Sequence, residues 1–252
     1  MCVTRAFQTV YTMWLREMLR FKRAKSRIVG SLATPLFFLI ILGTAIGSSY
    51  KIESYREFMT PGIIAMVLLF SSIFGGVSII WDREFGFLKE ILIAPVNRFF
   101  VALGKAFGGV TTAVIQGILL MIIAMSVGVE YRSLSGLLAS IPIMFIIGVG
   151  FISLGIALAS RIESHEGFQM VMSFLTMPLV LLSGAFFPLS ELPPWLKTAV
   201  YLNPLTYGVE ALRWALLYGE PEIPITICIT VLLSFAVITT FIGSWLFGRA
   251  KV

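Results

Sequence analysis

The sequence predicts an all-α integral membrane protein with six transmembrane helices. Of its 252 residues, 58% are hydrophobic and 13% are charged, whereas a soluble domain has about 45–50% apolar and about 25% charged residues. Six apolar runs without Asp, Glu, Lys, Arg or His approach or exceed the roughly 20 helical residues that span a bilayer. They cover residues 28–47, 61–80, 106–129, 137–160, 168–187 and 225–247. Their length and lack of alternating polarity argue against β-barrel strands.

The distribution of basic residues predicts the orientation. Most Lys and Arg residues precede the first run, lie between the second and third runs or follow the last run, with Arg161 on the same side. The other side has fewer: Lys51, Arg56, Arg132, Lys197 and Arg213. By the positive-inside rule both termini are cytoplasmic, in a multi-pass protein of a cell membrane. This asymmetry also explains the net charge of +6 without a nucleic-acid partner.

Residues 1–27 predict an amphipathic helix that lies in the membrane interface. Apolar side chains recur at helical spacing between basic ones, which suits the headgroup region of the lipid bilayer. The alternative is a surface helix packed on the protein itself. The residues that would face the lipid are Phe7, Tyr11, Trp14 and Met18.

Residues 188–224 are too polar for a span but rich in aromatic and aliphatic side chains. Pro193-Pro194 favours a helix start and Asn203-Pro204 a break, so we expect two short helices on the outer side. Their apolar side would lie in the outer interface or dip back into the protein, where broken backbone is tolerated at membrane depth. Pro178 before Ser183-Gly184 makes the fifth span the one most prone to irregularity.

Several chemistries are absent from the sequence. No span has an ionisable residue, which argues against a proton- or sodium-driven transporter. The single histidine, His165, lies in His-Glu-Gly-Phe-Gln, which lacks the second His of a zinc protease, and we expect it in a solvated loop. Gly104-Lys105 lacks the first glycine and the hydroxyl of a phosphate-binding loop. We therefore expect no enzyme activity and no cofactor in this chain, and energy for active transport would enter from another subunit.

The segment 81–105, WDREFGFLKEILIAPVNRFFVALGK, places charges between two apolar runs. Phe85, Leu88 and Leu92 recur at helical spacing, whereas the charged side chains would stay in water. The charged residues are Arg83, Glu84, Lys89 and Glu90. We expect a short helix along the membrane, with its apolar side inward and its charges in water, that ends at Pro95. Such a helix would dock a soluble partner; the alternative is a plain cytoplasmic loop.

Two segments of the sequence resemble a known family. Trp81-Asp82-Arg83-Glu84-Phe85-Gly86-Phe87-Leu88, followed by Ala94-Pro95 and Gly104-Lys105, is similar to a motif of the type-2 permease subunits of ABC exporters. These include permeases for drugs, antibiotics and lipo-oligosaccharides. The segment SGAFFPLSELPPWLKTAVYLNPLTYGVEALR resembles a second motif of this family. Phe87 departs from the pattern, since many members have a smaller or polar residue there.

The resemblance implies a single permease domain over residues 1–252, paired with a second copy or a homologue. Two cytoplasmic subunits would bind ATP and Mg and dock on a coupling helix that contains Glu84, Phe85, Gly86, Leu88, Lys89 and Glu90. Glu210 and Arg213 would belong to an outer gate. Cargo would pass between the permeases along the second and fifth spans, beside Phe70, Phe74, Phe174 and Met177.

An apolar, aromatic path suits hydrophobic or amphipathic cargo such as a drug, lipid or glycolipid. The expected function is therefore that of the membrane-spanning subunit of an ATP-binding cassette exporter. The alternative is a membrane scaffold or assembly factor without a transport role. The residues leave open the identity of the cargo and whether the two permeases are identical.

Overall fold

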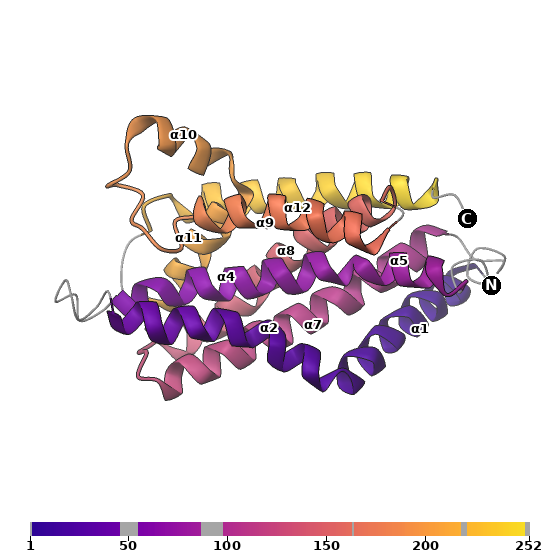
Figure 1. Cartoon of the computed structure of the whole chain (residues 1–252), viewed down its shortest axis with the longest axis horizontal. Helices are drawn as coiled ribbons and strands as arrows, with labels where there is room; N and C mark the ends of the chain where they lie inside the picture. The colour runs from indigo at the N-terminus through magenta and orange to yellow at the C-terminus, as the bar shows by residue number, and fades with distance from the viewer. Residues whose placement is uncertain (1, 46–54, 87–97, 163, 218–220, 250–252) are drawn as a thin grey trace.

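A computed structural model describes residues 2–45, 55–86, 98–162, 164–217 and 221–249. All regular structure in these ranges is helical, and most helices lie side by side along the long axis of the molecule (Figure 1). The chain order is α1 (Cys2–Arg23), α2 (Lys25–Phe37), the π-helix η1 (Phe38–Leu42), α4 (Tyr55–Gly75), α5 (Val77–Glu84), α7 (Arg98–Ser126), α8 (Leu134–Ala159), α9 (His165–Leu181), α10 (Pro194–Leu202), α11 (Pro204–Leu216) and α12 (Ile225–Gly248).

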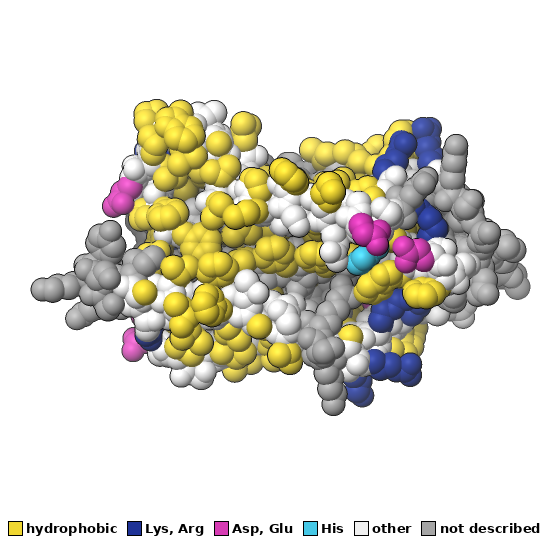
Figure 2. Space-filling model, viewed as in Figure 1, with side chains coloured by type: hydrophobic (Ala, Val, Ile, Leu, Met, Phe, Trp, Pro, Cys, Tyr) yellow, Lys and Arg dark blue, Asp and Glu magenta, His cyan; other side chains and the backbone are white. Residues whose placement is uncertain are grey.

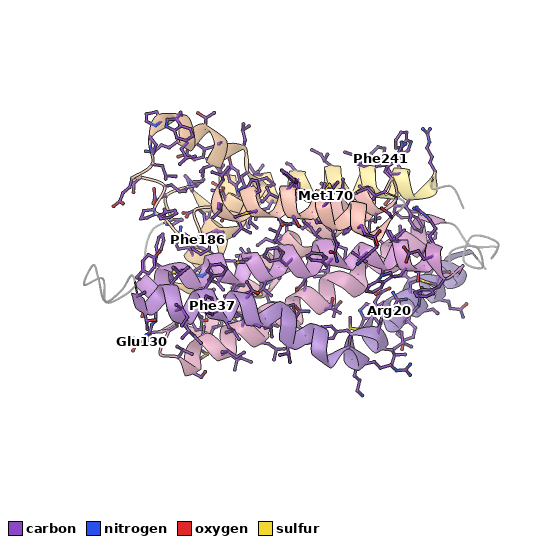
Figure 3. The ribbon with its side chains drawn as sticks, viewed as in Figure 1. Arg20, Phe37, Glu130, Met170, Phe186 and Phe241 are labelled. Atoms are coloured by element: carbon purple, nitrogen blue, oxygen red, sulfur yellow. The ribbon has the colours of Figure 1, made fainter. Side chains whose placement is uncertain are left out.

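Five helical stretches in the described residues are long and apolar enough to cross a bilayer: Ile28–Ala45, Tyr55–Glu84, Phe99–Ser126, Leu134–Ala159 and Ile225–Gly248. They confirm the all-α fold, and each corresponds to one of the six expected spans. Exposed apolar side chains cover the sides of the bundle, and Figure 3 shows Met170 on α9 and Phe241 on α12 projecting away from it. Lys and Arg gather near the end where α1 begins and α12 ends (Figure 2).

The expected loop 81–105 is shorter than predicted. Its first residues continue the second span to the end of α5 at Glu84, and its last residues belong to α7, which begins at Arg98. The prediction ended the second span at Ile80 and began the third at Ala106, so Asp82 and Lys105 fell in the loop. In the structure Asp82 and Lys105 are both buried and bind each other, so the helices extend past those charges.

The fifth predicted span, 168–187, also differs from the structure. Helix α9 ends at Leu181, and the chain turns between Leu182 and Phe187, with Gly184 at a φ of 71°. Its 17 residues have a helical rise of about 25 Å, short of the about 30 Å of a hydrocarbon core. Only Phe168, Met172, Thr176 and Val180 are buried, which is one narrow stripe along α9.

Side chains from neighbouring helices bind the backbone carbonyls at this broken end. Asn203 Nδ2 donates to Leu179 O at 2.7 Å, and Thr206 Oγ1 donates to Leu182 O at 3.2 Å. Further along, Arg213 Nη2 donates to Gly184 O at 3.0 Å, and the hydroxyl of Tyr55 donates to Phe186 O at 3.0 Å. A buried carbonyl without a partner costs about 1–3 kcal/mol, so these four hydrogen bonds permit the helix to end inside the bundle.

The two short helices expected in 188–224 are confirmed. Pro193 precedes α10, and Asn203 separates α10 from α11, where its side chain accepts a hydrogen bond from Leu205 N at 3.0 Å. Helix α11 is buried along most of its length and packs against α4, α8 and α12. Its apolar side therefore dips back into the protein, as one of the two predicted placements required.

Two of the helical stretches approach each other closely at glycines, which have no side chain. A Cβ atom on Gly76 would lie 2.5 Å from the carbonyl oxygen of Gly155, and one on Gly155 would lie 2.6 Å from that of Ile73. The two segments, at the α4–α5 junction and in α8, thus touch backbone to backbone, the arrangement that small residues permit between membrane helices.

Replacement of Gly155 by Leu should therefore destabilise the bundle, because the new side chain must displace backbone atoms of α4. Overpacking of this kind costs about 1–3 kcal/mol. The check is the free energy of unfolding in detergent, with Gly248→Leu as the control, since a Cβ there meets no atom within 4 Å. Equal stability of the two variants would contradict the close packing described.

Candidate functional site

The last residues of α5 connect the second span to several other elements. Asp82 points toward α1 and α7, Trp81 toward the start of α9, and Arg83 toward the end of α8. Glu84, which follows, is exposed. The four residues Trp81, Asp82, Arg83 and Glu84 are called the hub below. Its members diverge because adjacent residues on a helix project about 100° apart.

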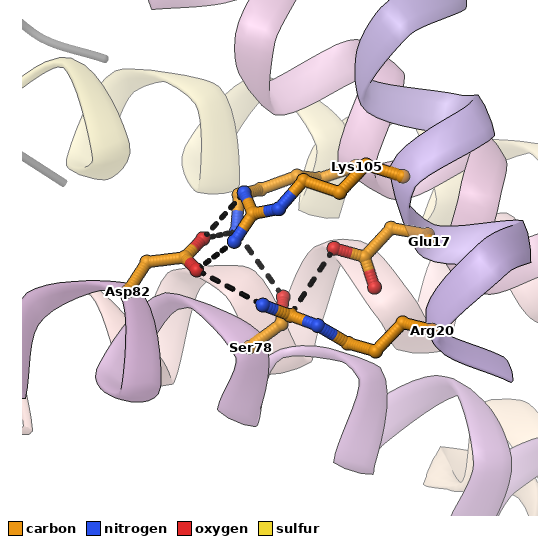
Figure 4. Close-up of polar contacts among 6 residues, drawn as sticks. Glu17, Arg20, Ser78, Asp82 and Lys105 are labelled. Carbon is orange, nitrogen blue, oxygen red and sulfur yellow. Dashed lines mark hydrogen bonds and ion pairs between the residues drawn. The ribbon is translucent and has the colours of Figure 1, made fainter. Parts of the chain in front are cut away.

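Asp82 lies at the centre of an ionic cluster (Figure 4). Its side chain is 2% exposed and binds the ammonium of Lys105, which is also buried and donates to Ser78 Oγ at 3.2 Å. From α1, Arg16 forks onto both carboxylate oxygens, and Arg20 Nη2 donates to Oδ1 at 3.2 Å. Glu17 lies 3.5 Å from Arg20 and balances part of this positive charge.

This cluster fixes the position of α1. Removal of one partner of a buried ion pair costs about 3–5 kcal/mol, because the remaining charge is left without compensation. Asp82 compensates three cations from two helices, so neither α1 nor α7 can move away from α5 without exposing a charge of the cluster. The arrangement is therefore rigid and specific to this packing of the three helices.

The neighbours of Asp82 in the hub contact the next two spans. The Trp81 ring stacks on His165 at the first turn of α9, with ring centroids 6.0 Å apart. Arg83 donates to Ile162 O at 3.1 Å and to Ser160 O at 3.5 Å, where α8 ends. The negative end of the α8 dipole also stabilises a cation at this position. His165 is thus half-buried against Trp81 in a helix and does not lie in the solvated loop that was expected.

The N-terminal helix packs along α7 and also exposes an apolar stripe. Trp14 Nε1 donates to Thr111 Oγ1 at 3.1 Å, and Gly104 and Gly108 of α7 give room for the α1 backbone and side chains. Phe7 and Tyr11 are exposed, whereas Trp14 and Met18 are half-buried. One side of this helix therefore packs on the protein, as the alternative placement required, and contact of the exposed stripe with lipid stays a prediction.

The expected docking helix differs from the structure at its start. The α5 helix ends at Glu84, and Gly86 has a φ of 73°, so one regular helix cannot run from Arg83 to Leu92. Phe85 is 83% exposed, although its side chain was predicted to face inward. Leu88, Lys89 and Glu90 lie outside the described residues.

The four candidate path residues separate into two places. Phe70 and Phe74 stack in α4 with ring centroids 6.4 Å apart and line a cavity between helices. Phe174 and Met177 lie on the exposed face of α9, with 82% and 65% of their surface accessible, and do not line this cavity. The structure therefore does not join all four residues into one path within a single chain.

Glu210 and Arg213 form the expected pair in α11. Glu210 is fully buried and also accepts a hydrogen bond from Glu222 N at 2.8 Å, while Arg213 lies 4.2 Å above the Phe58 ring. Burial lowers the pKa of the Arg213 guanidinium, and the Glu210 carboxylate opposes that shift. Within the described residues no group of three or more His, Cys, Asp or Glu side chains could hold a metal ion.

Sequence reasoning missed the burial of Asp82 and Lys105, which were counted as charges of a loop. A usable indication was present, because the family motif includes both the acidic residue after Trp81 and the Gly-Lys pair of residues 104 and 105. Two opposite charges at the facing ends of consecutive spans can bind each other once those helices pack.

Comparison with known proteins agrees with this architecture. Residues 8–217 match the family described as ABC-2 type transporter. A putative transport permease, ycf38, of Cyanophora paradoxa is 30% identical over 82% of this chain and 73% of that protein. Nodulation protein J of Rhizobium meliloti is 27% identical over 94% and 91% of the two chains.

The inner membrane transport permease YadH of Escherichia coli is 27% identical over 90% of this chain and 89% of its own. Similarity to permeases over most of each chain favours a transport subunit over a scaffold. The matched region extends from α1 through α11 and includes both the hub and the Glu210–Arg213 pair. This multi-pass membrane protein belongs to the ABC-2 type transporter family.

Proposed function

We propose that this chain is the membrane-spanning subunit of an ATP-binding cassette exporter that moves hydrophobic or amphipathic cargo and couples to separate ATPase subunits. The observation that carries the proposal is the hub. The C-terminal end of helix α5, Glu84 and Phe85, is exposed. It directly follows residues that contact α1, α7, α8 and α9. A displacement of this end of α5 by an ATPase subunit would therefore be transmitted to most of the bundle. Coupling to a separate ATPase requires such transmission.

The exposed terminus has the properties of a docking surface. Phe85 presents a large apolar side chain to solvent beside the charged Glu84. Aromatic side chains, Phe among them, are enriched in protein interfaces. The partner would be a cytoplasmic subunit that binds ATP and Mg, and residues 87–97 would extend the contact. Two such subunits and two permeases would make the complete exporter.

A second permease would cover the exposed side of α9. Only one stripe of that helix is buried within this chain, and Met170, Phe174 and Met177 are exposed. We assign α9 as the fifth of six spans, a shortened one that is completed by the buried turn after Leu181. In this arrangement Phe174 and Met177 of each copy would face the cargo path between the permeases, while the Glu210–Arg213 pair would hold its outer end closed.

The distribution of charge supports cytoplasmic termini. The hub, the start of α1 and the end of α12 share one end of the bundle, and α10 lies at the other (Figure 1). Basic side chains gather near the first of these ends (Figure 2), as expected for the cytoplasmic side. The exposed stripe of α1 would then rest in the inner leaflet.

Replacement of Phe85 by Asp should uncouple the exporter, because a charge would replace the apolar anchor. We expect at least tenfold less of the ATP-binding subunit to copurify with the permease. Leu202→Asp is the control, since Leu202 is 81% exposed at the α10 end. Unchanged copurification and unchanged ATPase activity in Phe85→Asp would refute docking at this terminus.

Replacement of Asp82 by Asn should destabilise the fold by about 3–5 kcal/mol, because three cations lose their shared counter-charge. The measurement is chemical unfolding of the permease in detergent. The ATPase activity of the complex with its ATP-binding subunits is measured as well, at a temperature where the variant is folded. Glu84→Gln is the matched control, because that neighbouring carboxylate is exposed. If the Asp82 variant unfolds like the control, the ionic cluster does not hold α1 in place.

Cysteine labelling tests the orientation. With Cys2 and Cys228 replaced by Ser, Glu191→Cys should react with a membrane-impermeant maleimide in intact cells, and Glu84→Cys only after the cells are opened. Both residues are exposed, so accessibility within the chain does not limit either reaction. The opposite labelling pattern would invert the proposed topology.

A further inference from the structure

A cavity of about 550 Å³ lies between α1, α2, α4, α5, α7 and the start of α9. This volume falls within the about 300–1,000 Å³ of small-molecule sites. The chain bends between α1 and α2 (Figure 1). Ala24, at this bend, lines the cavity. The ionic cluster around Asp82 holds α1 in this bent position, so the cavity is a built part of the fold.

One wall of the cavity carries uncharged polar groups. Gln116 of α7 is 6% exposed, and its Oε1 accepts hydrogen bonds from Ser31 Oγ of α2 at 2.9 Å and from Ser71 Oγ of α4. Thr112 lies one turn before Gln116 and lines the same wall. Three helices thus bring an amide and several hydroxyls together in an otherwise apolar bundle, where each group can exchange its hydrogen bonds with a ligand.

A second wall is aromatic. Phe70 and Phe74 stack with their planes 25° apart, and Trp81 of the hub also lines the cavity. Such faces bind alkyl chains and the apolar sides of rings by burial of their surface. The cavity therefore combines hydrogen-bonding groups on one side with an apolar platform on the other, which matches an amphipathic molecule.

The two charged side chains in the lining, Glu17 and Arg20, form an ion pair with each other. Glu17 and Arg20 are 3.5 Å apart, and Arg20 also binds Asp82. His165 is the other titratable residue of the lining and stacks on Trp81. A charged ligand would have to be desolvated without an unpaired opposite charge to receive it, which is unfavourable. This arrangement selects for a neutral head group.

We propose that this cavity binds the neutral, hydroxyl-bearing head group of an amphipathic molecule. Gln116, Ser31 and Ser71 hydrogen-bond the head, and Phe70 and Phe74 contact its apolar part. The inference rests on the proposed function in one respect: the bound molecule is cargo that has entered from the inner leaflet. It adds a site within one permease that precedes the path between two permeases.

The test is direct binding to the purified permease in lipid nanodiscs, without ATPase subunits or ATP. The probes are decyl glucoside, decyl sulfate and decyltrimethylammonium, which share a chain and differ in the head group. We expect saturable binding of the glucoside, at least tenfold tighter than that of either charged probe, above the partition into protein-free nanodiscs. Equal affinities for the three probes, or no saturable binding, would overturn the proposal.

Two variants locate the binding. Gly30 lines the cavity, and a Cβ there meets no atom within 4 Å, so Gly30→Phe should fill the space without destabilising the fold and abolish glucoside binding. Gly248→Phe is the matched control, because its surroundings are equally open. Unchanged binding in Gly30→Phe would place the glucoside elsewhere and refute the assignment.

Gln116→Leu should weaken glucoside binding about tenfold, the effect of a lost hydrogen bond to a buried polar group. It should leave binding of decyltrimethylammonium unchanged, and this split separates head-group recognition from a change in packing. Gln8→Leu, at an exposed position of α1, is the control. Failure of these binding tests while Phe85→Asp still uncouples ATPase would refute the cavity alone; loss of the Phe85 effect would refute the exporter assignment instead.

Discussion

The burial of one carboxylate, Asp82, is the constraint on which this end of the structure depends. A charge inside an apolar bundle is stable only when opposite charges and hydrogen bonds surround it. Lys105 supplies one partner from α7, and Arg16 and Arg20 supply two from α1. The requirement to satisfy Asp82 thus places an N-terminal helix and two spans against each other, and it lets α5 and α7 continue beyond their apolar segments.

Neighbouring residues extend this constraint to the rest of the bundle. Trp81 contacts α9, and Arg83 binds the residues where α8 ends, because consecutive residues of a helix point in different directions. The same geometry leaves Glu84 and Phe85 exposed beyond the buried residues. A compact connector with an exposed tip is well suited to transmit movement, and the cavity beside it lies where displacement of α1 or α5 would alter its shape.

The opposite end is organised by backbone groups rather than by charge alone. The turn after α9 leaves carbonyls without helical partners, and Asn203, Thr206, Arg213 and Tyr55 donate to them. Tyr55 belongs to α4, Asn203 and Thr206 lie at the start of α11, and Arg213 lies in its last turn. The motif that spans the two short helices therefore has a structural role, since it closes the break in α9 and fastens α11 inside the bundle.

The sequence by itself determined the helical membrane class, five spans and the two short helices divided at Asn203. These features follow from local properties: apolar length, which must match the bilayer, and proline, which cannot donate a helical hydrogen bond. The Glu210–Arg213 pair was also predictable, because residues three apart share a helix face. Only the tertiary structure decided that Asp82 and Lys105 are buried, that α9 stops at Leu181, that Phe85 faces outward, and that Phe70 and Phe74 line a cavity while Phe174 and Met177 do not. Each of these features depends on which residues distant in sequence come together. From the sequence alone, a charged residue or a helix end is expected to be exposed, because its partners on other helices are not known.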